Sequence, residues 1–307
     1  MTSRERRTTS SPARGDVVIG VEHERAHPPA GDGFVDAVTI SWGDRGTDLY
    51  GLARIGMTPG GASALAVLFS GREPVAAVAR DGLAADGTDW ASVEAGGVAM
   101  ATGAPLERWS VRFATDDGRH SFELELEAAS EPAALDDAVA RSGGMEGYEQ
   151  LCVVRGTVRV DGAARQVACL GQRGHTWGAP DWSRIALARS LTVWADGGPG
   201  VALSAIRPAG ASNHAQEAVW AALLGPDEIK PVADPRLSTT YDGAGHQRRA
   251  GLELWVADED DVPERASGEV LCGSTLELGP LALDLAFFAW HFEGREGVGR
   301  YDVLRPA

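Results

Sequence analysis

Short apolar runs, many of them alternating with polar residues, recur along almost the whole chain. Examples are "FVDAVTISW", "DLYGLARIGM", "ALAVLFSG" and "IALARSLTVWAD", and glycine, aspartate or proline separates most of them. A period of two is the pattern of a strand with one buried face, and turn residues at roughly 8–12-residue intervals are typical of antiparallel sheets. The pattern predicts an all-β protein made of antiparallel barrels or sandwiches, and two halves rich in hairpins favour two barrels side by side.

Two hairpins are the clearest units in this pattern. In "RWSVRFATDDGRHSFELELEA", the residues Trp109, Val111 and Phe113 alternate with polar residues before a turn at 116–118, and a second alternating run follows. In "YEQLCVVRGTVRVDGAARQVACL", a "DG" turn at 161–162 joins two similar runs. Both segments predict antiparallel hairpins, and the first has one dry and one wet face.

One segment, "EPAALDDAVARSGG", departs from the strand pattern. It has apolar residues at helical spacing, Pro132 near its start, and Gly143 and Gly144 at its end. These features predict one short helix linking two halves of the chain. The predicted units are a disordered tail over residues 1–18, an N-terminal β domain over 19–143 and a C-terminal β domain over 144–307.

Composition and charge narrow the classes of partner. Apolar residues make up 44% of the chain, and 28 basic against 44 acidic residues give a net charge of −16. Such a surface repels phosphate backbones and anionic lipids, so we expect neither nucleic acid nor a membrane surface as partner. The three cysteines, Cys152, Cys169 and Cys272, form no CxxC pair, so we expect no structural zinc site and a reducing compartment.

The N-terminus and the apolar runs predict a location. The stretch "MTSRERRTTSSPARGD" is basic and lacks the apolar run of a secretory signal. No stretch approaches the roughly 20 apolar residues that span a bilayer. We therefore expect a soluble, cytoplasmic protein without a membrane span.

The stretch "LGQRGHTWGAPDW", residues 170–182, concentrates polar and aromatic side chains in a chain otherwise rich in small apolar residues. Arg173, His175 and Trp177 stand two positions apart, so in an extended segment they share one face. Asp181 and Trp182 follow a "GAP" turn that allows them to fold back toward the same place. We interpret this face as the wall of an apolar pocket.

Each of these residues also has a structural interpretation. His175 is either a proton donor or a buried histidine that joins two strands by hydrogen bonds. Asp181 either orients His175 or caps a turn, and Trp177 and Trp182 either line the pocket or belong to the core. Arg173 is expected to pair with a carboxylate, and Glu149 in "GYEQ" is a candidate partner.

A second pair of candidates lies in "TVWADGG". Trp194 and Asp196 are two apart on an expected strand and so share a face. If that face lines the pocket, burial beside indole rings raises the pKa of Asp196, which then acts as a general acid. The alternative is a turn aspartate before the two glycines.

Motifs of other enzyme classes are absent. The sequence contains no GxSxG, no HExxH and no GxxxxGK[ST]. His23 and His27 are four apart, but Pro28 follows and the lead-in is strand-like, so we do not expect a metal there. The sequence therefore predicts neither a metal nor another cofactor.

The stretch "YEQLCVVRGTVRVDG…GQRGHTWGAPDW" resembles the carotenoid 1,2-hydratase (hydroxyneurosporene synthase)-like superfamily of tandem lipocalin-like proteins. The resemblance spans most of residues 19–300, and its specific part is H-x-W-G. It implies two lipocalin-like (calycin-type) antiparallel barrels side by side, with an apolar cavity near their junction. It also implies catalytic roles for His175, Trp177 and a later aromatic-x-Asp pair, here Trp194 and Asp196, although the family has tyrosine where Trp194 stands.

These observations lead to one leading function and one alternative. The leading hypothesis is a cofactor-independent lyase or cyclase, hydratase-like, that protonates an isoprenoid or polyketide-like small molecule in an apolar cavity. The expected catalytic residues are His175, Asp196 and Asp181, and the expected substrate-binding residues are Trp177, Trp182, Trp194, Arg173, Tyr148 and Glu149. The alternative is a non-catalytic protein that binds a lipid or a hydrophobic metabolite.

Overall fold

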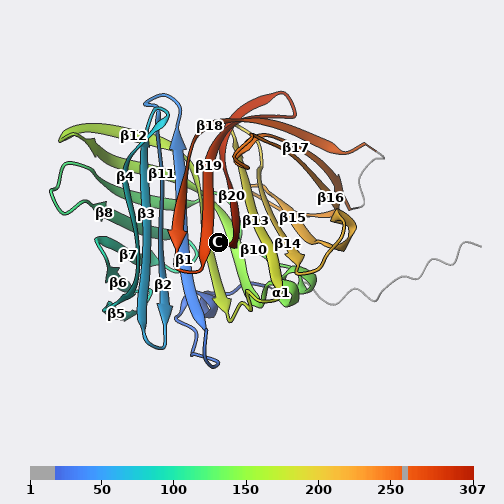
Figure 1. Cartoon of the computed structure of the whole chain (residues 1–307). Coiled ribbons are helices and arrows are strands. Elements are labelled where there is room, and N and C mark those ends of the chain that lie inside the picture. The colour runs from blue at the N-terminus through green and yellow to red at the C-terminus, as the bar shows by residue number, and fades with distance from the viewer. Residues whose placement is uncertain (1–17, 258–261) are drawn as a thin grey trace, which may run out of the picture.

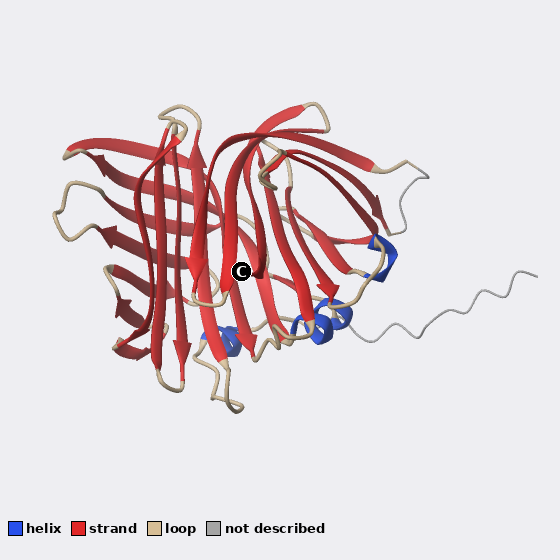
Figure 2. Cartoon of the chain, in the orientation of Figure 1, coloured by secondary structure: helices blue, strands red, loops and turns tan. Residues whose placement is uncertain are grey.

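The structure, a computed structural model, describes residues 18–257 and 262–307, so residues 1–17 of the predicted tail lie outside the described residues. Strands form two units that lie side by side, an open curled sheet and a closed barrel (Figures 1 and 2). In the described part of the chain there is one α-helix and there are two short 3-10 turns, η1 (Val21–Glu24) and η2 (His214–Gln216). The predicted all-β class is confirmed.

The N-terminal unit is an antiparallel sheet of 12 strands. Its order is β4-β3-β2-β1-β12-β11-β9-β8-β7-β6-β5, and β10 pairs with β11 beside this path. The sheet curls, and β3 contacts β6 and β7 across the interior. The strands are β1 (Val35–Asp44), β2 (Leu49–Thr58), β3 (Gly61–Ser70), β4 (Glu73–Leu83), β5 (Asp86–Asp89), β6 (Ser92–Ala95), β7 (Val98–Ala104), β8 (Arg108–Ala114), β9 (Ser121–Ala128), β10 (Ala133–Ala134), β11 (Met145–Val160) and β12 (Ala163–Gly178).

The C-terminal unit is a closed antiparallel barrel in which β13 pairs with β20. Each strand pairs with its neighbour in the chain, so the barrel is a simple meander. Its strands are β13 (Ile185–Ala195), β14 (Gly200–Pro208), β15 (Ala218–Leu224), β16 (Ile229–Tyr241), β17 (Gln247–Val256), β18 (Glu264–Leu278), β19 (Leu281–Phe292) and β20 (Arg295–Pro306).

The arrangement corrects two expectations. One of the two units is a closed barrel, whereas the other is a curled sheet whose edge strands β4 and β5 do not pair in the described part of the chain. The hairpin β11–β12, expected at the start of the second domain, belongs to the first sheet, because β12 pairs with β1 and β11 pairs with β9. The division between the two sheets therefore falls between Gly178 and Ile185 rather than at residue 143.

The alternating pattern explains the local structure well. On β9 buried and exposed residues alternate strictly, with Phe122, Leu124 and Leu126 inside. The predicted turns at 116–118 and 161–162 join β8 to β9 and β11 to β12, and Asp161 and Gly162 both have positive φ.

Three apolar cores result from this architecture. One fills the interior of the curled sheet around Trp42, Phe113 and Phe122, and another fills the barrel around Phe288 and Trp290. The third lies between the sheet and the barrel, since its members come from β2, β3 and β11 on one side and from β13, β14 and β19 on the other. The outer faces of β2, β3 and β11 are therefore buried against those of β13, β14 and β19.

The predicted helix is α1 (Asp137–Gly143). The side chain of Asp136 accepts a hydrogen bond from the backbone N–H of Val139 at its start, and Gly144 ends it with φ of 64°. It contacts β11, β14 and β15, so it covers one end of the junction between the units. Among the described residues, no helix has the length and apolar character that a membrane crossing requires.

Candidate active site between the sheet and the barrel

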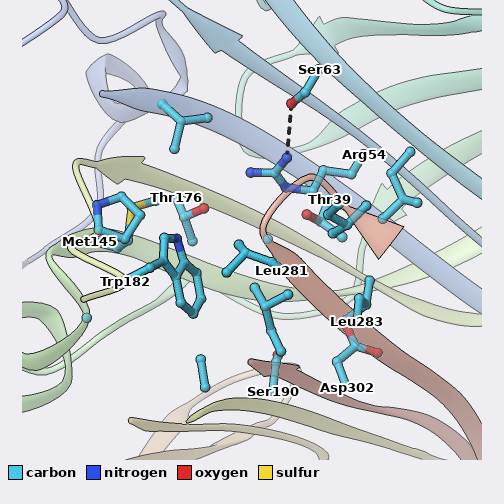
Figure 3. Close-up of a pocket in the computed structure, with 18 of the residues that line it drawn as sticks. Thr39, Arg54, Ser63, Met145, Thr176, Trp182, Ser190, Leu281, Leu283 and Asp302 are labelled. Carbon is cyan, nitrogen blue, oxygen red and sulfur yellow. Dashed lines mark hydrogen bonds between the residues drawn. The ribbon is translucent and has the colours of Figure 1, made fainter. Parts of the chain in front are cut away.

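A cavity of about 510 Å³ lies between the outer face of the curled sheet and the wall of the barrel. Strands β1, β2, β3, β11 and β12 line it on one side, and β13, β14, β19 and β20 line it on the other. Figure 3 shows polar side chains from both sides, among them Arg54 and Asp302, around apolar residues such as Leu281 and Leu283. Its size and mixed lining are typical of small-molecule sites.

On the sheet side, one row of residues crosses the cavity wall. Leu65, Arg54, Thr39, Gly174 and Glu149 are direct cross-strand partners in turn, from β3 to β11. Directly opposed residues in an antiparallel sheet point to the same face. Arg54 and Glu149 therefore face one cavity from a single row, with Thr39 and Gly174 between them.

The carboxylate of Glu149 lies across Gly174. A Cβ atom at Gly174 would lie 2.7 Å from both carboxylate oxygens, so the absence of a side chain there makes room for them. Gln172 donates a hydrogen bond of 2.8 Å from Nε2 to Glu149, and the indole N–H of Trp194 donates to Oε1 of Gln172 at 3.3 Å. Burial raises the pKa of Glu149 in spite of the hydrogen bond from Gln172.

On the barrel side, two acids of the described residues line the cavity, the exposed Glu277 and the more buried Asp302. The side chain of Asp302 is 13% exposed, and its Oδ2 lies 3.0 Å from Nε of Arg300. Burial raises the pKa of Asp302 to about 6, Arg300 opposes the shift, and the charge of Glu149 adds to it. Oδ1 of Asp302 is buried and has no hydrogen-bond partner among the described residues. That oxygen is therefore available to a bound molecule.

Arg173, His175 and Trp177 share one face of β12, as the spacing predicts, but none of them lines this cavity. The cavity wall includes Gly174 and Thr176, which point the other way. Arg173 and His175 are fully buried on the interior side of the curled sheet. The expectation that the H-x-W face lines the hollow between the two units is wrong.

The side chain of His175 is held by a carboxylate from the first strand. Its Nε2 lies 2.6 Å from Oδ1 of Asp36, which also accepts a hydrogen bond of 3.2 Å from the indole of Trp90. Burial lowers the pKa of His175 although Asp36 opposes the shift. Burial would raise the pKa of Asp36, but the hydrogen bond and charge of His175 outweigh it, so that pKa is lowered. Of the two interpretations of His175, the geometry matches the histidine that joins two strands.

A second buried group surrounds Glu24, which follows the N-terminal tail. Arg173 lies 2.5 Å from its Oε1, and Tyr148 and Trp109 donate hydrogen bonds of 2.5 and 2.6 Å to its two oxygens. Arg173 also donates to the hydroxyl of Tyr148. The predicted carboxylate partner of Arg173 is therefore present, but it is Glu24 and not Glu149.

The remaining expected site residues are dispersed. Asp181 is exposed and accepts hydrogen bonds from the backbone and hydroxyl of Ser183, so it caps a turn and does not orient His175. Asp196 is also exposed in a turn, so the expected buried acid beside Trp194 is wrong. Trp194 is buried in the core between the units, whereas Trp182 lines the cavity.

Trp177 lies near the rim of the curled sheet. Its ring stacks on that of His27 with centroids 3.8 Å apart, and its N–H donates to Glu146 at 3.2 Å. His27, Asp36 and His175 place potential ligand atoms within 4.8 Å of one another, so they are the group in the described chain that could hold a metal ion. In this structure they bind one another, since His175 and the backbone N–H of His27 both contact Asp36.

Three residues of this geometry were not expected from the sequence. Asp302 stands in "GRYDVLRP", where it alternates with the buried Tyr301 and Val303, and this alternation marks it as an outward-facing strand carboxylate. Arg54 carries the same signal in "LARIG". Nothing in the pattern distinguishes an outward face in water from one packed against a second sheet. Asp36, 139 positions from His175, has no local signal.

Comparison with known proteins supports the fold. Residues 20–307 match a family described as a domain of unknown function, DUF7064, and no curated protein matches the sequence significantly. The fold resembles that of CghA, with 14% identity over 90% of this chain and 89% of that chain, at a TM-score of 0.62. It also resembles kievitone hydratase from Nectria haematococca (12% identity, 94% and 93% covered, TM-score 0.62). A third similar structure is an ATTH protein from Nitrosomonas europaea (12%, 96% and 98%, TM-score 0.66).

Proposed function

The chain belongs to the DUF7064 family, and we propose that it is a cofactor-independent lyase or cyclase, hydratase-like, that acts on an apolar small molecule between the sheet and the barrel. The observation that carries the proposal is the acid pair in the cavity. Asp302 has a pKa raised to about 6 and an oxygen without a partner in the described chain, and Glu149 faces the same space. Paired carboxyl groups with raised pKa values in a cleft are typical of proton-transfer sites.

The two carboxyl groups would divide the proton chemistry. Asp302 donates its proton to a carbon–carbon double bond or a carbonyl oxygen, and the carboxylate that remains lies beside Arg300. Water adds to the cation and gives its proton to the carboxylate of Glu149, or an internal double bond adds and the departing proton goes to the same base. Transfer of a proton from Glu149 back to Asp302 restores the starting state.

The surroundings suit a cationic intermediate. Trp182 lines the cavity, and the face of an indole ring attracts positive charge. The apolar lining lowers the local dielectric constant and so strengthens the effect of each charge. One positioned acid contributes about 10²–10⁴-fold in rate, so binding and orientation of the substrate supply the rest.

In this proposal the face of β12 that carries His175 and Trp177 does not contact the substrate and acts only by positioning the cavity wall. His175 and Asp36 join β12 to β1, and these strands carry Gly174 and Thr39 in the cavity wall. The name of kievitone hydratase favours a hydratase, and CghA, which shares the fold, is known in a structure with Sch210972. The isoprenoid or polyketide-like substrate class is what the family resemblance of the H-x-W-G stretch implies. At 12–14% identity these relatives share the fold, and the reaction of this chain is our inference.

The test combines a substrate screen with labelled solvent. The protein is incubated in D₂O with unsaturated isoprenoids and polyketide-like polyenes, and mass spectrometry follows deuterium uptake and the addition of water. We expect turnover by the wild type, a loss of about 10²–10⁴-fold in Asp302→Asn, and full activity in the exposed control Asp196→Asn. Ligands that bind in the cavity without ever exchanging or adding deuterium would instead identify a carrier of hydrophobic metabolites.

A further inference from the structure

Arg54 is a cation in the cavity wall without an anionic partner. It lies in the middle of β2, and its NH1 donates one long hydrogen bond of 3.4 Å to the hydroxyl of Ser63 (Figure 3). No carboxylate of the described residues lies within 4.0 Å of its guanidinium. Asp81 of β4 also lines the cavity and its charge acts to raise the pKa of Arg54, but it is exposed, forms no ion pair with Arg54 and accepts a hydrogen bond from the backbone of Gly82.

The other arginines in the interior are all paired. Arg173 lies 2.5 Å from Glu24, Arg300 lies 3.0 Å from Asp302, and Arg189 forms an ion pair with Glu217. Removing a cation from water is costly unless a hydrogen-bonded anion compensates. Arg54 is half-buried, and this burial lowers its pKa, which is consistent with the missing compensation. Of the arginines that line the described cavity, Arg80, Arg189 and Arg300 each form an ion pair with a carboxylate, and Arg54 does not.

We infer that Arg54 binds a carboxylate group of the ligand whose apolar body fills the cavity. This inference rests on the proposed function only in taking the same cavity as the ligand site. A single guanidinium presents two parallel N–H groups, which match a carboxylate in a bidentate pair. Thr39, the direct neighbour of Arg54 across the strands, places a hydroxyl next to it.

The position of Arg54 also orients the ligand. Arg54 and Glu149 are separated by three strand spacings, from β2 through β1 and β12 to β11. With about 4.8 Å between strands, their Cα atoms are about 14 Å apart. The ligand is then an elongated monocarboxylate with its charge at Arg54 and its unsaturated part near Glu149 and Asp302.

The test uses binding alone, so that it does not depend on a known substrate. Decanoate, decanol and decyl phosphate are titrated by calorimetry into the full-length wild type and into Arg54→Met, Arg54→Lys and the control Arg112→Met. Arg112 is an exposed arginine of β8, away from the cavity. Leu283→Trp, which fills the cavity from β19, reports whether binding occurs there.

In the wild type we expect decanoate to bind about 10–100-fold more tightly than decanol, the range for a hydrogen-bonded charge pair. Arg54→Met removes this preference without weakening decanol, Arg54→Lys keeps part of it, and Arg112→Met keeps all of it. Equal binding of decanoate and decanol by the wild type overturns the inference, even if Arg54→Met fails to fold, and leaves the proposed function intact.

Two further outcomes are decisive. Tighter binding of decyl phosphate than of decanoate, dependent on Arg54, overturns the assignment of a carboxylate. If no probe binds, or if Leu283→Trp leaves binding unchanged, the cavity is not the ligand site, and the proposed function fails together with the inference.

Discussion

The two faces of β12 differ in whether their charged groups are paired within the protein or face a cavity. On the interior face, His175 is bound by Asp36, and Arg173 is bound by Glu24 and Tyr148. On the outer face, the absence of a side chain at Gly174 leaves room for the carboxylate of Glu149. Asp302 lies on the barrel side of the same cavity, and one of its oxygens has no hydrogen-bond partner in the described chain.

This difference separates structural from reactive polar groups. On the interior face each charged group is paired with another group of the protein, and although Nδ1 of His175 and Nε of Arg173 lack a hydrogen-bond partner among the described residues, neither residue lines the cavity. An acid beside a cavity with a raised pKa and an open oxygen retains capacity for a ligand. The polar and aromatic residues of the stretch 170–182 that point into the sheet are structural, whereas the acid available to a ligand, Asp302, lies on β20.

The largest expected effect is on the interior face. Arg173→Leu leaves Glu24 as an unpaired buried carboxylate, which typically costs about 3–5 kcal/mol of stability. Urea unfolding measures the loss, and the exposed Arg112→Leu is the matched control, expected within about 0.5 kcal/mol of the wild type. A stability change below about 1 kcal/mol in Arg173→Leu would contradict a structural role for this ion pair.

On the outer face, removal of a charged group is expected to raise the stability of the protein rather than lower it. Because the pKa of Asp302 is raised from 3.8 to about 6, the folded protein binds more protons than the unfolded chain in this range, and stability falls as pH rises through it. At 1.4 kcal/mol per pKa unit, the free energy of unfolding is about 3 kcal/mol lower above pH 6 than below pH 4 as a result of this one group.

Asp302→Asn removes this pH dependence. Its stability relative to the wild type is expected to rise between pH 4 and pH 6 and then to stay level, although the lost ion pair with Arg300 reduces the absolute gain. Urea unfolding at a series of pH values measures the difference. A constant difference across this range would show that the pKa of Asp302 is not raised.

Gly174→Ala tests the coupling between Glu149 on the sheet and Asp302 on the barrel. The new Cβ atom displaces the carboxylate of Glu149, and overpacking of this kind costs about 1–3 kcal/mol. Because the charge of Glu149 raises the pKa of Asp302, the fall in stability with pH should also shift to lower pH. An unchanged profile would mean that Glu149 does not lie over this glycine.

Trp194→Phe is expected to have a smaller effect. It removes the hydrogen bond from the indole to Gln172, which in turn holds Glu149, and a typical bond of this kind contributes about 1 kcal/mol. Unfolding measures the loss, and the pH profile of activity reports any shift of Glu149. A loss above about 3 kcal/mol would assign Trp194 mainly to packing.

The smallest effects belong to the two aspartates first suggested by the sequence. Asp181→Asn and Asp196→Asn lie in exposed turns, so both should change stability by about 0.5 kcal/mol or less and leave turnover unchanged. Loss of turnover in either variant at unchanged stability would return the acid to the position that the family resemblance implies.

The sequence predicts local structure more reliably than it predicts which faces meet. The hairpin turns at 116–118 and 161–162, the helix α1 and the shared face of Arg173, His175 and Trp177 all follow from patterns within a few residues. The residues that bind the side chains of β12 come from other parts of the chain. The alternation of buried and exposed residues is the same whichever face of a strand packs against the barrel, so it does not predict which face does.

For the same reason the sequence did not identify the acid pair. The sequence suggests Glu149 as a binding residue, but Asp302 lies 153 positions away and has the pattern of a polar residue on the solvent-exposed side of a strand. They become a site because two outer sheet faces pack together and leave a void. Asp36 and Glu24, which bind His175 and Arg173 on the interior face, are also far from these partners along the chain.

The most direct test of the central claim is a crystal structure of the protein with decanoate or with the molecule that co-purifies with it. The account predicts density between the curled sheet and the barrel, with a polar end at Arg54 and the body beside Asp302 and Trp182. Density inside the curled sheet, against His175 and Asp36, would contradict it.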